Sequence, residues 1–205
     1  GDTAFWDKLQ QTGYETVSTE VFAKMADTQT PQGILTVLEQ PVYDLTQLLE
    51  QPDPLFLMLE NLQDPGNLGT MIRTGEGAGI TGVIMNNQTV DIFNPKTIRA
   101  TMGSIFRVPF VYVPDLALVL EQMHAKGIYT YAAHLKGQEY YDSFSFREPT
   151  AFLIGNEGNG LSKEISDQAG QYLKIPMEGR VESLNASIAA ALLMYEAHRQ
   201  RSARL

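Results

Sequence analysis

A glycine-rich stretch, LIGNEGNGLS at residues 153–162, joins a short apolar run to an expected helix. A loop in that position can bind an anion through the backbone N–H groups at the start of the helix. A phosphate-binding loop ends in Lys followed by Ser or Thr, whereas this one ends in Leu161 and Ser162. Glu157 would repel phosphate and suits a ligand with a cationic or hydrogen-bond-donating group. The stretch therefore indicates either a site for such a ligand or a plain glycine-rich turn.

A single arginine on a helix of small and apolar residues is the second feature with chemical potential. The sequence DPGN at residues 64–67 predicts a turn, with Asn67 capping a helix that begins near Leu68. Arg73 follows about two turns later, on the same face as Gly69. A guanidinium in this setting needs a polar or anionic partner, either a carboxylate of the fold or a phosphate of a substrate.

A third polar group lies between an apolar run and the last expected helix. Ile175 and Pro176 end the run, and Ser183 is a good N-cap for the helix that follows. Asn185 is expected one turn inside that helix, where capping does not explain it.

Several other chemistries are excluded or disfavoured. The chain has no cysteine, so it has no disulfide, thiolate nucleophile or thiolate metal ligand. His124, His134 and His198 lack the spacing of metal ligands, and we expect no metal. GAGITG at residues 77–82 matches the dinucleotide pattern GxGxxG, but it closes a helix and leads into a strand. Because the fingerprint requires the reverse order, this position argues against a dinucleotide-dependent oxidoreductase.

Length and charge limit the remaining possibilities. The 205 residues suffice for one α/β domain with a full core and a small additional piece. The net charge of −9 does not favour polyanions, so nucleic-acid binding requires a local basic face or another domain. No apolar run reaches the roughly 18 residues of a membrane span, and no signal-peptide pattern is present. We therefore expect a cytoplasmic protein without a membrane partner.

Apolar runs and amphipathic stretches alternate after residue 54. Strands are expected at residues 55–59, 82–85, 105–111, 129–132, 152–154 and 172–175, and helices at residues 67–75, 95–102, 115–126, 162–168 and 184–201. This alternation predicts an α/β fold with a mostly parallel sheet, helices on both faces and a ligand site beyond the strands' carboxyl ends. A short helix at residues 19–25, capped by Thr19, and a strand-like run at residues 34–38 precede it.

Together these segments resemble the SpoU (TrmH-like) group of SPOUT methyltransferases. The family's three motifs are similar to NLQDPGNLGTMIR at residues 61–73, LIGNEG at residues 153–158, and IPM at residues 175–177 with SLNAS at residues 183–187. The resemblance implies transfer of a methyl group from S-adenosylmethionine to a ribose 2′-hydroxyl of RNA, with ribosomal RNA favoured over transfer RNA. It further implies a homodimer, a site bordered by both subunits and a deep C-terminal trefoil knot, which spacing alone does not indicate.

The resemblance also implies the roles of particular residues. The expected catalytic residues are Arg73, Asn67, Glu157, Ser183 and Asn185. Because the pKa of arginine exceeds about 12, Arg73 either is oriented as a base by a phosphate or stabilises the forming alkoxide while another group accepts the proton. The residues expected to hold the cofactor are Ala132, Ala133, His134, Ile154, Gly155, Asn156, Glu157, Ile175, Met177, Ser183, Leu184 and Asn185. Candidate RNA contacts, or else solvated surface charges, are Lys96, Arg99, Arg107 and Lys136.

The first forty residues are similar to the end of an RNA-binding domain that full-length relatives often carry. We expect residues 1–40 to be a remnant of that domain with its linker, and residues 41–205 to be the methyltransferase domain. A separate RNA-binding part would reconcile the net charge of −9 with an RNA substrate. This chain would then bind cofactor but methylate poorly. The alternative function is a catalytically idle RNA-binding or assembly module with the same fold.

Overall fold

The computed structural model describes residues 3–26, 28 and 30–202, and the chain divides into two units, Gly1–Gln40 and Pro41–Leu205. The first unit contains α1 (Thr3–Thr12) and α2 (Thr19–Met25). Ser18, rather than the predicted Thr19, caps α2, because its side chain accepts a hydrogen bond from the Val21 N–H. The strand predicted at residues 34–38 is absent, and none of the described side chains in this unit is buried. A segment this small cannot bury a core of its own.

The second unit is built on a seven-stranded sheet in the order β3-β2-β1-β6-β4-β7-β5. Every neighbouring pair of strands is parallel, as the sequence predicts. The strands are β1 (Leu55–Leu59), β2 (Gly82–Asn86), β3 (Phe110–Val113), β4 (Tyr129–Ala133), β5 (Glu139–Tyr140), β6 (Thr150–Ile154) and β7 (Gln171–Lys174). The central strands β1, β2 and β6 are buried along their whole length, which explains why they read as continuous apolar runs.

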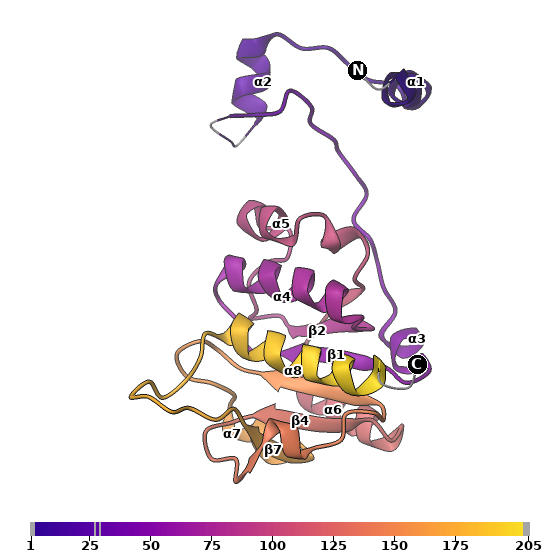
Figure 1. The fold of residues 1–205 in the computed structure, drawn as a ribbon. Coiled ribbons are helices and arrows are strands. Elements are labelled where there is room, and N and C mark those ends of the chain that lie inside the picture. Colours follow the sequence, from indigo (N-terminus) through magenta and orange to yellow (C-terminus); the bar gives the residue numbers. More distant parts are fainter. Residues whose placement is uncertain (1–2, 27, 29, 203–205) are drawn as a thin grey trace. The chain divides into compact units, whose positions relative to one another are not determined.

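Helices cover both faces of the sheet (Figure 1). On one face, α4 (Pro65–Ala78) and α8 (Ala186–Ser202) contribute their apolar side chains to the core. On the other face, α3 (Leu45–Leu49), α6 (Leu116–Ala125) and α7 (Lys163–Gln168) do the same. The remaining helix, α5 (Pro95–Thr101), packs against α4. The prediction of an α/β sheet with helices on both sides is confirmed.

The strand predicted at residues 105–111 is wrong for residues 105–109. Residues 105–111 were expected to be extended, but Ser104–Phe106 form a 3₁₀ turn (η1) and β3 begins only at Phe110. Gly103, with φ of 87°, turns the chain into η1. Pro109 lacks an N–H group for the ladder, and the strand starts directly after it. The short elements α3, β5 and η2 (Tyr141–Ser143) were not predicted.

Because the sheet is parallel, the carboxyl ends of β1, β6, β4 and β7 lie along one edge. The four segments that leave this edge begin at residues 60, 155, 134 and 175, so the sheet gathers all three motif segments there. The C-terminal trefoil knot stays a prediction from the resemblance. Among the described residues, no helix has the length and apolar character needed to cross a membrane.

Candidate active site

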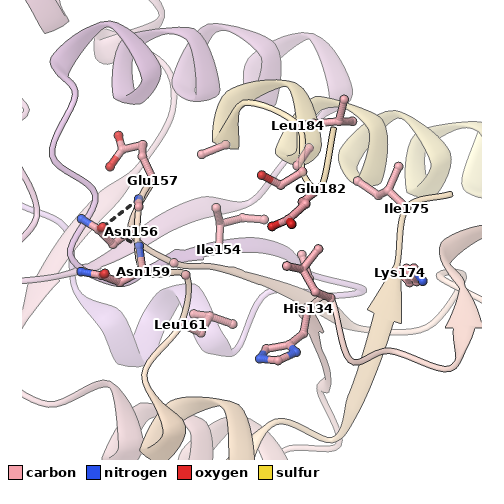
Figure 2. Close-up of a pocket in the computed structure, with 18 of the residues that line it drawn as sticks. His134, Ile154, Asn156, Glu157, Asn159, Leu161, Lys174, Ile175, Glu182 and Leu184 are labelled. Atoms are coloured by element: carbon pink, nitrogen blue, oxygen red, sulfur yellow. Dashed lines mark hydrogen bonds between the residues drawn. The ribbon is translucent and has the colours of Figure 1, made fainter. Parts of the chain in front are cut away.

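A cavity of about 260 Å³ lies at this edge of the sheet, between the segments after β4, β6 and β7 and the start of α8 (Figure 2). Ten of the twelve residues predicted to hold a cofactor line it: Ala133, His134, Ile154, Gly155, Asn156, Glu157, Ile175, Met177, Ser183 and Leu184. The other two do not. Ala132 is fully buried in the core beneath, and Asn185 lies outside the lining.

The glycine-rich loop folds back tightly on itself. A side chain at Gly155 would place its Cβ 2.0 Å from the backbone carbon of Gly160, so no other residue fits without moving the loop. Asn156 and Gly160 exchange two backbone hydrogen bonds of 3.0 and 2.8 Å, and Gly160 has φ of 69°. The close approach and the left-handed turn explain why the loop is rich in glycine.

Several N–H groups of this loop already have acceptors within the chain. The Asn156 side chain accepts hydrogen bonds from the N–H groups of Gly158 and Asn159, at 2.9 and 3.0 Å. The Ser162 N–H donates to the buried carboxylate of Glu60 at 2.7 Å. The anion cradle that strand-loop-helix order made possible is therefore absent, and the loop shapes one wall of the cavity instead.

The carboxylate of Glu157 is turned away from the cavity, toward the start of α4 (Figure 2). It accepts hydrogen bonds from the N–H groups of Gln63 and Asp64 and from the Asn67 amide, at 3.1, 2.9 and 3.1 Å. Partial burial acts to raise its pKa, but these hydrogen bonds outweigh burial, and the pKa lies below its ordinary value. Glu157 is thus an ionised group that joins two motifs rather than a ligand for a cationic molecule.

A line of amide hydrogen bonds extends from Glu157 to the third motif. The Asn67 amide donates to Glu157, and the Asn185 amide donates to the Asn67 oxygen at 3.0 Å. The Asn185 oxygen accepts from the N–H groups of Ser187 and Ile188, at 2.8 and 3.4 Å. Three of the five predicted catalytic residues are therefore bonded in series, although they are up to 118 positions apart in the chain.

Two predicted helix caps were wrong. The cap of α4 is Asp64, which accepts from the Asn67 N–H at 2.7 Å, so Asn67 lies in the first turn with its side chain free for Glu157. Asn185, rather than Ser183, caps α8 and precedes the helix instead of lying one turn inside it. Ser183 lies in the preceding loop, where it lines the cavity.

Arg73 stands apart from this network. It is exposed on α4, about 9 Å along the helix axis from Asn67 at 1.5 Å per residue. Within residues 3–26, 28 and 30–202 its side chain forms no hydrogen bond or ion pair, so the structural ion pair considered from the sequence is absent. It does not line the cavity either. An exposed, unpartnered guanidinium is suited to a ligand from outside the chain.

The four side chains predicted to contact RNA differ in whether they already form an ion pair with a carboxylate. Lys96 pairs with Asp64 at 3.3 Å, and Arg107 forms a two-point ion pair with Glu76. Arg99 and Lys136 pair with no carboxylate among the described residues. RNA contact by these four side chains stays a prediction.

Sequence reasoning missed a second set of amides that shapes the glycine-rich loop. Asn61 has φ of 54°, a left-handed conformation. The buried Asn86 exchanges two hydrogen bonds with it, of 3.0 Å from the Asn61 N–H and 2.8 Å to the Asn61 side chain. The Asn61 carbonyl in turn accepts from the Asn156 amide at 2.9 Å. Asn86 is the last residue of β2 and lies outside the three motifs, so nothing in the sequence signalled its role.

The SpoU rRNA Methylase family matches residues 54–195. The chain belongs to this family. It is 37% identical over 188 residues to an uncharacterized tRNA/rRNA methyltransferase of Synechocystis, covering 90% of this chain and 67% of the relative. It is 35% identical over 179 residues to RlmP of Bacillus subtilis, a 23S rRNA (guanosine(2553)-2′-O)-methyltransferase, covering 87% and 70%.

Solved SpoU structures share the fold. The SpoU methyltransferase AviRb of Streptomyces viridochromogenes, in complex with the cofactor AdoMet, matches with a TM-score of 0.86 and 30% identity over 96% of this chain and 77% of that one. An AdoMet-bound rRNA methyltransferase of Sinorhizobium meliloti matches with a TM-score of 0.83 and 34% identity, covering 89% and 70%. The family and the fold class suggested by the three motifs are confirmed.

Proposed function

We propose that this chain is an S-adenosylmethionine-dependent methyltransferase that modifies a ribose 2′-hydroxyl of RNA, with ribosomal RNA as the preferred substrate. The observation that carries the proposal is the combination of two features: a prebuilt cavity at the motif loops, and an unpartnered Arg73 on the adjoining helix α4. RlmP, a relative 35% identical, is a 23S rRNA 2′-O-methyltransferase by name, which supports both the ribose and the ribosomal substrate.

The cavity residues suit S-adenosylmethionine. The walls of the cavity are largely apolar, with Ile154, Leu161 and Leu184 among the lining residues. The volume of the cavity is near the ~300–1,000 Å³ range of small-molecule sites. No basic cluster or free row of loop N–H groups is present to hold a phosphate among the described lining residues. A neutral adenosine with a cationic methionine side chain fits this environment, whereas a nucleotide does not.

The bound cofactor would supply a methyl group on a positively charged sulfur. The protein's own task is to exclude water from the reacting atoms, to align the ribose oxygen with the methyl group and to assist loss of the 2′-hydroxyl proton. The tight turn at Gly155 and the series of bonds from Glu157 through Asn67 to Asn185 fix the loops around the cavity before any ligand arrives. In this proposal Arg73 binds the substrate's phosphate and stabilises the forming alkoxide, while the proton of the 2′-hydroxyl leaves to solvent. The ionised Glu157, occupied by three donors, holds the loops rather than the proton.

Homodimer formation is part of the proposal. Ile188, Leu192 and Tyr195 form an apolar stripe on α8 and are 50%, 37% and 49% exposed. The Tyr195 hydroxyl lies beside Gly77, one turn from Arg73 on α4. A second copy on this stripe would bring Arg73 to the border between the subunits, which accounts for its absence from the cavity of a single chain.

The test is transfer of a labelled methyl group from S-adenosylmethionine to ribosomal RNA and to transfer RNA, followed by alkaline hydrolysis. A 2′-O-methyl group protects the adjacent phosphodiester, so label should appear in alkali-stable dinucleotides. We expect saturable cofactor binding and this product, with ribosomal RNA the better substrate. A matched RNA with 2′-deoxyribose at the mapped site should accept no label. Label on a base would refute ribose methylation and indicate a base methyltransferase. RNA binding without any transfer would refute the proposal and favour the idle RNA-binding module.

A further inference from the structure

The segment between β7 and α8 carries a carboxylate that has no assigned role. Glu182 lines the cavity, and Figure 2 shows its carboxylate turned toward the space between the lining side chains. Across the described part of the chain, its oxygens take part in no hydrogen bond or ion pair. A carboxylate that faces a cavity without a partner provides a fixed negative charge for a ligand there.

The other charged groups of the lining do not neutralise Glu182. Glu157 is turned away and bonded to Gln63, Asp64 and Asn67. His134 stacks on Tyr172, and burial, followed by the charge of Lys136, holds its pKa below the ordinary value, so the ring is neutral at pH 7. Lys174 also lines the cavity but forms no ion pair with Glu182. Glu182 and Lys174 therefore each bring an unpaired charge to the lining among the described residues, and Figure 2 shows the Glu182 carboxylate turned toward the cavity with Lys174 at its far side.

We propose that Glu182 is a specificity-determining residue that distinguishes S-adenosylmethionine from its demethylated product, S-adenosylhomocysteine, by the charge on sulfur. The inference rests on the proposed function. The two molecules share the adenosine, the ammonium and the carboxylate, but only the first has a positive sulfonium. A carboxylate near the sulfur favours the cofactor before transfer and loses that attraction afterwards, which promotes exchange of the spent product.

The experiment is calorimetric titration of the chain with each of the two molecules at low ionic strength, where screening is weakest. For Glu182→Gln, we expect about fivefold weaker binding of S-adenosylmethionine, as for a unit charge pair a few ångströms apart in a water-accessible site. Binding of S-adenosylhomocysteine should change less than about twofold, since only the sulfonium is lost between them. The affinity ratio, not either affinity alone, is the readout.

Glu178→Gln is the matched control, because Glu178 is an exposed carboxylate in the same segment but not among the lining residues. It should leave both affinities unchanged, and unchanged thermal midpoints should show that both variants fold. Equal weakening of the two ligands by Glu182→Gln would mean that the carboxylate faces their shared ammonium, which would overturn the inference, as would no weakening at all. Failure of the unmutated chain to bind S-adenosylmethionine would instead refute the proposed function, and this inference with it.

Discussion

The glycine-rich loop after β6 and the outer face of α4 lie next to each other but are built in opposite ways. In the loop, the Asn156 side-chain amide and five backbone N–H groups donate within the chain: those of Asn156, Gly158, Asn159, Gly160 and Ser162. On α4, Arg73 is exposed and unpaired among the described residues. Hydrogen bonds that form within the chain before a ligand binds indicate a preorganised site. An exposed cation without an ionic partner instead indicates a site for an anionic ligand.

This difference distinguishes cofactor binding in the cavity from substrate binding at α4 within one proposed active site. The cavity side is rigid because its amides fix one another, from Asn86 through Asn61 to Asn156. Under the proposed function, RNA or a second subunit supplies the negative charge or surface that the α4 side lacks. Substitutions in the loop should therefore affect cofactor binding and stability together, while substitutions at Arg73 should affect catalysis alone.

The largest effect is expected for Gly155→Ala. Its new Cβ would lie 2.0 Å from the Gly160 backbone carbon and 2.1 Å from the Leu161 nitrogen, so backbone must move on both sides. We expect destabilisation of at least about 3 kcal/mol and loss of detectable S-adenosylmethionine binding. Thermal unfolding and calorimetry measure the two effects. Gly179→Ala is the control, because its nearest contact would be a Val181 side-chain carbon at 4.0 Å and it does not line the cavity, so it should behave as the unmutated chain does.

Arg73→Ala should separate catalysis from cofactor binding. Removal of one group that stabilises the reacting oxygen lowers turnover by about 10²–10³-fold in comparable sites. Because Arg73 does not line the cavity, the dissociation constant for S-adenosylmethionine should remain within about twofold. Methyl transfer under saturating cofactor, with calorimetry on the same preparation, provides the measurement. Unchanged turnover would remove Arg73 from the mechanism.

Asn86→Ala should weaken cofactor binding by about tenfold without touching the cofactor, because Asn61 would lose the partner that holds its left-handed backbone. The conservative Asn86→Asp keeps an acceptor for the Asn61 N–H, and a rotated Asn61 amide can donate to it, so affinity should return. Calorimetry on both variants tests this positioning role. Equal losses in the two would indicate a packing defect at a buried position rather than a lost hydrogen-bond pattern.

The elements that sequence predicts well are those whose signals are local. Asn94 precedes Pro95 and caps α5 by accepting from the Lys96 N–H, and Gly79 ends α4 in the left-handed conformation that glycine favours at this position. In the turn at residues 64–67, both Asp64 and Asn67 are good caps. Pro65 decides between them, because proline favours the first helical position and therefore places the cap at Asp64.

The site depends on pairs of residues that local signals do not connect. Glu157 binds groups 90 to 94 positions earlier in the chain, and Asn156 binds a carbonyl 95 positions earlier. The motif resemblance located these residues but not the direction of the Glu157 carboxylate, which faces α4 rather than a ligand. Glu182 and Asn86 lie outside the quoted motifs, and only the folded chain brings them to the cavity or to its supporting amides.

The smallest effect is expected at a second arginine near α4. Arg107, a candidate RNA contact, already forms an ion pair with Glu76, and its hydrogen bonds, with a weaker one from Ser104, lower the pKa of Glu76 to about 2. Because the folded pKa lies below the ordinary 4.5, the pair stabilises the fold above about pH 4.5, and this contribution disappears as pH falls toward about 2. Both side chains are exposed, so the stabilisation is small.

In Arg107→Ala, a nuclear magnetic resonance titration should show the pKa of Glu76 rising toward its ordinary value, since the largest cause of its shift is gone. The thermal midpoint at pH 7 should barely change, because solvent screens an exposed pair. Methyl transfer should fall far less than in Arg73→Ala, because a guanidinium already neutralised by Glu76 has less attraction left for a phosphate. Equal losses at the two arginines would show instead that RNA displaces Glu76, and that the α4 face binds substrate through both cations.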